Sequence, residues 1–355
     1  MRFYPTVVTF ELTNACNLRC KHCYIRAGEK LEKELSLDEI KETLKELREI
    51  GTMEVEFSGG EPLLRPDLFK ILDVAHSLDF EITIATNGIL IDERIAKKFS
   101  DYSMNYIQIS LEGLKDAHEY IRGRGTFKRA IKAIKLLLDR DLRVAVRMTV
   151  TKKSLVDVSK VADLCVQLGV HKFGVMRFLP AGRGLLYKDE LMLNANDIVR
   201  LHEIVNSVYK KYRNKIEMST DPCGFFDEEL IRRLRHSRST LCPCGKTWCV
   251  IKPDGIVSPC EILNFYAGDV RRQKFSNIWE NAQVFKMFRE FNPKKLKGIC
   301  GSCKFRDVCG GYCRALAVLH TGDFYSEDFT CYHVQKFHES RMHSEKLDME
   351  SAEIS

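Results

Sequence analysis

The sequence predicts an α/β fold built around a parallel sheet. From residue 6 to about 213, apolar β-branched runs alternate with amphipathic helical patterns, and such alternation is typical of repeated strand–helix units. We count six units, fewer than the eight of a closed barrel. From about Met218 the alternation stops, and ten of the fourteen cysteines fall between residues 223 and 331. We therefore expect an α/β domain over residues 1–217, a cysteine-rich domain over 218–340 and a polar tail over 341–355.

Each predicted element follows from local patterning. Strands are expected where short β-branched and apolar runs occur, and helices where apolar residues recur every three or four positions. Ser36 with Glu39 forms a capping box that starts the first helix. The strands are expected at residues 6–12, 53–57, 81–85, 106–110, 143–150 and 172–178, and the helices at 37–50, 66–78, 92–99, 127–139, 155–168 and 195–213.

Three cysteines follow the first predicted strand, with the spacing Cys16-x3-Cys20-x2-Cys23. Iron–sulfur clusters normally take four thiolates, so three at this spacing can hold a four-iron cluster whose fourth iron lacks a protein ligand. An open metal position is where a substrate or cofactor binds. A Cys-x2-Cys pair alone also suits half of a zinc site or a redox dithiol. A zinc ribbon needs a second pair at a matching distance, however, and the next cysteine is Cys165.

The second predicted strand leads into Ser58-Gly59-Gly60-Glu61, where glycines let the backbone approach a ligand closely. An ordinary strand-to-helix turn is the alternative. Together with the cysteine run, this segment resembles the radical S-adenosylmethionine (SAM) enzymes. The resemblance implies a partial (β/α)6 TIM-like barrel, open rather than closed. It also implies a four-iron cluster on Cys16, Cys20 and Cys23 that cleaves SAM to a 5′-deoxyadenosyl radical.

The same resemblance implies that SAM is contacted from the C-terminal ends of the strands. Arg147 could face the SAM carboxylate, because Arg makes paired hydrogen bonds to carboxylates; a strand-edge charge is the alternative. Arg177 and Arg183, near the predicted barrel mouth, are expected to contact substrate carboxylates. The full set expected to bind SAM is Ser58, Gly59, Gly60, Glu61, Asn87, Ser110, Glu112 and Arg147.

The C-terminal cysteines form a second pattern, Cys300-x2-Cys303-x5-Cys309-x3-Cys313, with Cys331 further on and Gly255-x4-Cys260 upstream. This pattern resembles the SPASM extension of radical SAM enzymes, which implies two auxiliary four-iron clusters and so three [4Fe-4S] clusters in all. One would use Cys300, Cys303, Cys309 and Cys331. The other would use Cys260 and Cys313 with two of Cys242, Cys244 and Cys249, of which we take Cys242 and Cys244. A pair of structural zinc sites is the alternative.

Two cysteines fall outside these sets. Cys165 lies on a predicted helix and is expected in the core. Cys223 lies on a predicted loop, in Asp221-Pro222-Cys223-Gly224. It is a plain loop residue, a spare cluster ligand or a catalytic thiol that donates or accepts a hydrogen atom, and we keep it as the candidate catalytic residue.

Composition bounds the setting of the protein. The chain has 355 residues, 45% hydrophobic and 30% charged, with a formal net charge of +7. We find neither an apolar run long enough to span a membrane nor an apolar signal segment, so a cytoplasmic protein without membrane contact is expected. Many cysteines in such a protein indicate metal rather than disulfides. Because thiolate-bound clusters add negative charge, the basic balance does not indicate nucleic-acid binding.

The expected function is oxidative modification of a peptide or protein, with hydrogen abstraction from the substrate by the SAM-derived radical. A flavodoxin- or ferredoxin-type protein would supply the electron. Cys16 comes early in the chain, so no leader-recognition domain is expected before it. Tetrapyrrole side-chain modification in haem biosynthesis is therefore the alternative. A zinc-binding nucleic-acid module is a distant third reading, which would leave Gly59 and Gly60 without a role.

Overall fold

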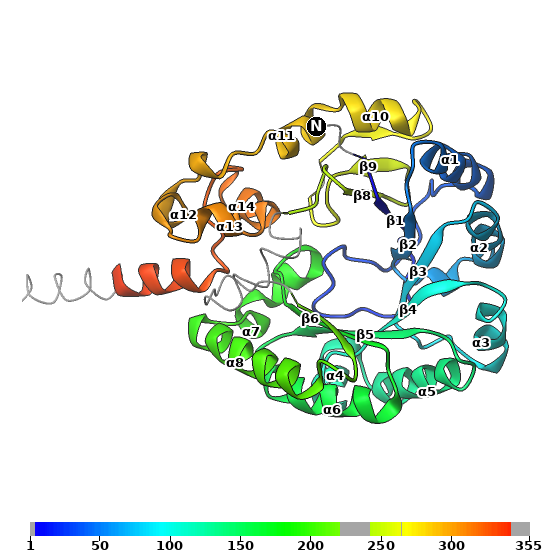
Figure 1. Ribbon diagram of the computed structural model, residues 1–355, viewed down its shortest axis with the longest axis horizontal. Coiled ribbons are helices and arrows are strands. Elements are labelled where there is room, and N and C mark those ends of the chain that lie inside the picture. The colour runs from blue at the N-terminus through cyan, green and yellow to red at the C-terminus, as the bar shows by residue number, and fades with distance from the viewer. Residues whose placement is uncertain (1–3, 221–241, 264, 342–355) are drawn as a thin grey trace, which may run out of the picture.

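The computed structural model describes residues 4–220, 242–263 and 265–341. Its centre is an arc of parallel strands with helices on the outside (Figure 1). The six predicted strands are all present, so the predicted α/β barrel fold is confirmed. They are β1 (Val7–Thr13), β2 (Glu54–Gly59), β3 (Glu81–Thr86), β4 (Met104–Ser110), β5 (Val144–Val150) and β6 (Lys172–Arg177).

The sheet extends beyond the predicted six strands at both ends. A short parallel strand, β7 (Glu217–Thr220), pairs with β6, so the boundary expected at residue 217 falls at its first residue. At the other end β8 (Trp248–Ile251) pairs in parallel with β1. β8 continues antiparallel into β9 (Ile256–Ser258) and then β10 (Gly268–Asp269). The cysteine-rich part of the chain therefore begins inside the same ten-stranded sheet as the barrel.

The helices of the barrel lie around the convex side of the arc (Figure 1). α1 begins after Ser36, which forms the predicted capping box with Glu39, and it buries Ile40, Leu44 and Leu47. α4 was not predicted. The helices here are α1 (Leu37–Glu49), α2 (Leu68–Ser77), α3 (Glu93–Phe99), α4 (Lys115–Arg122), α5 (Thr126–Leu138), α6 (Val158–Leu168), α7 (Lys188–Leu191) and α8 (Ala195–Tyr212).

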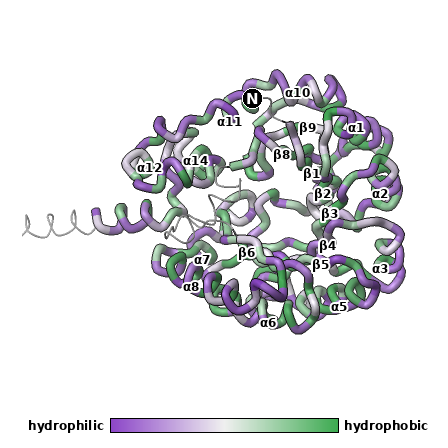
Figure 2. The backbone as a smooth tube through the Cα atoms, in the orientation of Figure 1, coloured by the Kyte–Doolittle hydropathy of each residue, from purple (hydrophilic) through white to green (hydrophobic). Residues whose placement is uncertain are grey.

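The two faces of the barrel sheet differ in polarity, because successive strand residues point to opposite sides. On β2, Val55 and Phe57 are fully buried in the main hydrophobic core. Their neighbours Glu54 and Glu56 line cavities inside the arc. Figure 2 shows the resulting mixture of hydrophilic and hydrophobic residues along the outer helices. The core therefore lies between strands and helices, and the concave side is left for polar side chains.

The C-terminal part continues from the β8–β9 hairpin, whose turn contains Gly255. One helix lies beside α1, a second packs against that helix, and three short helices lie farther along (Figure 1). They are α10 (Phe275–Asn281), α11 (Gln283–Arg289), α12 (Gly298–Ser302), α13 (Arg306–Cys309) and α14 (Arg314–Thr321). Among the residues described, no helix combines the length and apolar character needed to cross a membrane.

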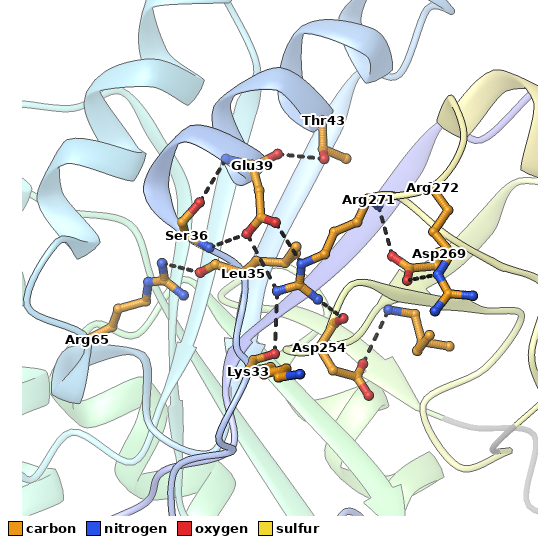
Figure 3. Close-up of polar contacts among 11 residues, drawn as sticks. Lys33, Leu35, Ser36, Glu39, Thr43, Arg65, Asp254, Asp269, Arg271 and Arg272 are labelled. Atoms are coloured by element: carbon orange, nitrogen blue, oxygen red, sulfur yellow. Dashed lines mark hydrogen bonds and ion pairs between the residues drawn. The ribbon is translucent and has the colours of Figure 1, made fainter.

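One arginine connects this C-terminal part to the barrel. Arg271, which follows β10, donates from Nε to the Glu39 carboxylate on α1 at 2.7 Å. Its guanidinium also contacts the carbonyl oxygens of Asp254 and Lys33. Figure 3 shows these contacts around α1 and the turn at Asp254. The polar network therefore joins residues more than two hundred positions apart.

Candidate active site and cysteine centres

The loop that carries Cys16, Cys20 and Cys23 lies inside the arc, between β1 and α1 (Figure 1). It closes on itself, since Cys16 N donates to Gly28 O and Gly28 N donates to Asn14 O, both at 2.8 Å. From the segment after β6, Arg183 donates to the carbonyl oxygens of Cys20 and Ala27. Arg183 therefore supports the loop, and because it also lines the cavity beside the three cysteines, its contact with a substrate carboxylate stays a prediction.

Gly59 and Gly60 allow this loop to approach the end of β2. Gly60 N donates to Thr13 O, and Glu61 N donates to Ala15 O. A Cβ atom at Gly60 would lie 2.1 Å from Ala15 O, and one at Gly59 would lie 2.5 Å from Thr13 O. Gly59 also has a φ of +120°. Glycine is therefore required at both positions because the end of β2 lies close to the cysteine loop. This requirement holds in addition to any approach to a ligand.

The three thiols open into one cavity on the concave side of the sheet. Leu18 N donates to Cys16 Sγ at 3.4 Å, and Arg122 Nη1 lies 3.7 Å from Cys20 Sγ. Burial raises the pKa of the Cys20 thiol to about 11, against the opposing effect of Arg122. These donors suit a thiolate sulfur, which is the form that binds iron.

Seven of the eight residues expected to bind SAM line this same cavity: Ser58, Gly59, Gly60, Asn87, Ser110, Glu112 and Arg147. Glu61 is fully buried beside it. Its carboxylate accepts hydrogen bonds from Thr86 Oγ1 at 2.7 Å and from Asn87 N at 2.9 Å. Glu61 therefore holds the end of β3 in place and with it Asn87.

Glu112 is the centre of a buried ionic group. Its Oε1 accepts from Arg122 Nε at 2.9 Å and lies 3.3 Å from His22 Nε2, while Oε2 accepts from Thr149 N. Burial alone would raise the pKa of Glu112, but Arg122 and His22 hold it well below the usual value. Sequence reasoning missed Arg122 because it missed α4, whose short charged sequence has no side-chain cap.

Further along the barrel interior, Glu56 and Glu261 lie near Arg147, and Glu11 lies near Glu261. Burial raises the pKa of Glu11 to about 8 and that of Glu261 to about 7, and it also raises the pKa of Glu56. Arg147 opposes the shift at Glu56 and Glu261. Its guanidinium has no hydrogen bond or ion pair with any described residue, so Arg147 is available to a carboxylate within the cavity.

Four C-terminal cysteines gather in a small hydrophobic cluster: Cys242, Cys244, Cys260 and Cys313. The Cys244 thiol is hydrogen-bonded to those of Cys242 and Cys260. The hydrogen bond from Cys244 lowers the pKa of Cys242 to about 7. Cys249 lies elsewhere, since it is fully buried in the main core on β8, opposite Val8 of β1. The structure thus separates Cys249 from the cysteines that the sequence could not distinguish from it.

Cys300, Cys303, Cys309 and Cys331 line a second, small cavity with Tyr312 and His333. In the part of the chain described, no three His, Cys, Asp or Glu side chains converge as a single-ion site. Cys165 is buried in the core, as expected. Cys223 lies outside the described residues. Arg177 is buried against the C-terminal part, where it donates to Thr330 O.

Comparison with known proteins matches two stretches of the chain to family models. Residues 10–165 match the radical SAM superfamily, and residues 242–304 match SPASM, an iron–sulfur cluster-binding domain. An AdoMet-dependent heme synthase of Methanosarcina barkeri is 31% identical, with 92% of this chain and 96% of that protein covered. Mycofactocin maturase MftC of Mycobacterium tuberculosis is 30% identical, with 90% and 80% covered.

Solved structures share the fold at lower identity. SuiB of Streptococcus suis bound to S-adenosylmethionine has a TM-score of 0.76 and 20% identity, with 92% of this chain and 77% of that chain covered. The structure titled native anSMEcpe with bound AdoMet and Cp18Cys peptide has a TM-score of 0.72 and 18% identity, with 98% and 99% covered. At these identities the likeness concerns the fold.

Proposed function

We propose a function for this chain from one premise: it belongs to the radical SAM superfamily and carries a SPASM iron–sulfur cluster-binding domain. Radical SAM enzymes require SAM and a four-iron cluster, and SPASM domains bind auxiliary clusters. The residues present fit these groups. Soft thiolate donors suit iron–sulfur clusters, and the Cys16–Cys23 loop presents three of them to a cavity with N–H donors to two of the sulfurs.

In this proposal Cys16, Cys20 and Cys23 hold the cluster that binds SAM. The bound cofactors supply an electron and, from SAM, a 5′-deoxyadenosyl radical that takes a hydrogen atom from a substrate carbon. Arg147 and Asn87 bind SAM directly, and Glu61 acts on SAM through Asn87. Arg122 lies between Glu112 and Cys20 in the buried wall and stabilises negative charge on each. A flavodoxin- or ferredoxin-type protein is the proposed electron donor.

The auxiliary clusters are assigned by which cysteines lie together. Cys242, Cys244, Cys260 and Cys313 hold the first, and Cys300, Cys303, Cys309 and Cys331 hold the second. The geometry of the described residues supports this division, since the first four share one hydrophobic cluster and the other four line one cavity.

One observation carries the reaction type. Glu261 and Ile262, which directly follow Cys260, line the same cavity as Cys16, Cys20 and Cys23. A substrate in that cavity therefore lies between the radical-generating site and the first auxiliary site. This arrangement suits oxidation, in which a substrate radical passes one electron to a neighbouring cluster.

We propose the carboxylate side chain of a tetrapyrrole as the first candidate substrate, ahead of the peptide that the sequence favoured. The heme synthase relative is similar over 96% of its length, and another relative is an Fe-coproporphyrin III synthase. Arg177 and Arg183, which were expected from the sequence to contact substrate carboxylates, line the same cavity and suit such a substrate. A peptide is the second candidate, supported by the similarity to the mycofactocin maturase.

The test begins with anaerobic reconstitution, which should give about twelve irons per chain. SAM and a strong reductant are then added with and without Fe-coproporphyrin III. The tetrapyrrole should stimulate 5′-deoxyadenosine formation, and mass spectrometry should show a product that has lost carboxyl groups. Stimulation by a peptide but not by the tetrapyrrole would favour the second candidate. Bound zinc with no SAM cleavage would contradict the proposal.

Cys223 remains the candidate catalytic thiol, proposed from the sequence alone. A Cys223→Ala variant should form 5′-deoxyadenosine but accumulate less product. Unchanged product formation would remove it from the mechanism.

A further inference from the structure

Asp328 lies between the two auxiliary cysteine groups and contacts both. Its side chain is fully buried, and its Oδ2 accepts from Cys313 N at 3.2 Å. Its backbone N–H donates to the Cys300 thiol, and its carbonyl oxygen accepts from Cys331 N at 3.0 Å. One residue therefore touches a proposed ligand of the first cluster and two proposed ligands of the second.

Arg177 brings a positive charge to this junction from the barrel. It is the last residue of β6, only 3% exposed, and it also lines the main cavity. Its Nη1 donates to Thr330 O at 2.5 Å, and Nη2 lies 3.8 Å from Asp328 Oδ2. The guanidinium stacks over the Tyr312 ring at 4.0 Å, and Tyr312 lines the second auxiliary cavity.

We propose that Asp328 and Arg177 are positioning residues that set the reduction potentials of the two auxiliary clusters relative to each other. The inference rests on the proposed function because it requires clusters at both cysteine groups. The potential of a cluster depends on nearby charge, on hydrogen bonds to its sulfurs and on solvent exposure. Reduction adds a negative charge, which a buried carboxylate disfavours and a buried guanidinium favours.

The two charges should act differently on the two clusters. Asp328 contacts both groups, so its negative charge lowers the potential of each. Arg177 donates to the carbonyl oxygen of Thr330, the residue before Cys331, and lies over the ring of Tyr312, which lines the second cavity. Arg177 therefore raises mainly the potential of the second cluster.

The experiment compares charge-changing variants in full-length protein that also carries Cys16→Ala, Cys20→Ala and Cys23→Ala, so that only the auxiliary clusters contribute. Iron content should be about eight per chain. Redox titration followed by electron paramagnetic resonance then gives a midpoint for each cluster, and Cys300→Ala identifies the second. The variants are Asp328→Asn, Arg177→Gln and Arg177→Lys. Asp323→Asn, an acid of the same segment that pairs with Lys297 at the surface, is the control.

Asp328→Asn should raise both midpoint potentials by about 59 mV. For a one-electron couple, this shift changes the ratio of reduced to oxidised cluster about tenfold at a given potential. Arg177→Gln should lower the second midpoint, while Arg177→Lys and Asp323→Asn should leave both unchanged. If the Asp328→Asn variant does not load iron, the midpoint of the second cluster in Arg177→Gln, compared with that in Arg177→Lys, tests the inference. Shifts of the same sign in Asp328→Asn and Arg177→Gln would overturn the inference, as would fully loaded variants with wild-type midpoints. About four irons in the wild-type chain would contradict the proposed function and this inference with it.

Discussion

At the scale of single residues, the barrel interior handles buried charge in two ways. Glu112 is compensated, since Arg122 and His22 lie against its carboxylate. Glu11 is compensated only in part: its Oε1 has no hydrogen-bond partner among the described residues, and the effect of Lys252 is opposed by Glu261 and Asp254. Burial without a partner favours the neutral form of an acid, whereas a close cation favours the charged form. In the folded protein Glu112 should therefore be charged and depend on its cations for stability, whereas Glu11 should be stable in its neutral form.

Arg122→Met should destabilise the protein strongly, because it removes the closest cation from the buried Glu112 and leaves His22 as its remaining ionic partner. Breaking a buried ion pair in this way costs about 3–5 kcal/mol. Adding Glu112→Gln should recover part of the loss. The measurement is anaerobic denaturation of loaded protein, with Arg140→Met as control, since Arg140 pairs with the exposed Glu93 and such pairs contribute about 0–1 kcal/mol. Equal losses in the two single variants would contradict the ionic role of Arg122.

Glu11 should make the stability depend on pH. Its pKa rises from 4.5 to about 8 on folding, so the folded state retains a proton that the unfolded state releases. The associated stability is complete below pH 4.5 and is lost as the pH rises towards about 8. The thermal midpoint of wild type should therefore fall relative to Glu11→Gln across this range. Parallel curves would contradict the prediction, and Glu81→Gln, at an exposed position of the same sheet, is the control.

At the scale of elements, the cysteine loop depends on the backbone of another strand. Gly60→Ala should displace the loop, because the added Cβ would meet Ala15 O at 2.1 Å. We expect loss of the SAM-binding cluster alone, with about eight irons per chain instead of about twelve. Gly51→Ala is the control, since Gly51 has a φ of +89° but open space around it, so it tests backbone strain without a clash. Full iron content in Gly60→Ala would show that the loop adapts.

A second prediction at this scale concerns Cys249, which lies on β8 and apart from the first auxiliary group. Cys249→Ala should keep the full iron content, because Cys249 packs in the barrel core. Cys244→Ala should lose about four irons, since Cys244 contacts both Cys242 and Cys260. Iron and sulfide analysis with cluster spectroscopy checks both variants. Iron loss in Cys249→Ala with retention in Cys244→Ala would reverse the assignment.

The elements that the sequence predicts are those that local patterns encode. Apolar alternation predicts β1 to β6, and the capping box predicts the start of α1. β7 is only four residues long and carries no apolar alternation, so it was missed, and so was α4 with Arg122. The place of Cys249 depends on the pairing of β8 with β1, a contact between residues far apart in the chain that cysteine spacing does not encode.

At the scale of the whole molecule, the barrel and the C-terminal part share one sheet and, through α10 and α11, the main hydrophobic core. β8 pairs with β1, and Phe275, Trp279 and Phe285 belong to the same hydrophobic core as the barrel strands. Separate domains usually meet through smaller and more polar interfaces. Here the sheet that supports the radical site is continuous with the hairpin that leads to Cys260, so the distance between the two sites is set by strand pairing.

This continuity predicts that the described barrel and C-terminal part unfold together. Scanning calorimetry of the loaded protein should give one transition, because opening either part exposes the shared core. Arg271→Gln should lower its midpoint by the equivalent of about 1 kcal/mol, a modest value since the pair with Glu39 is partly exposed. Arg272→Gln, at the neighbouring and largely exposed position, should have a smaller effect. Two separated transitions would mean that the β1–β8 pairing does not couple the parts, and the spacing of the two cluster sites would then depend on a movable interface.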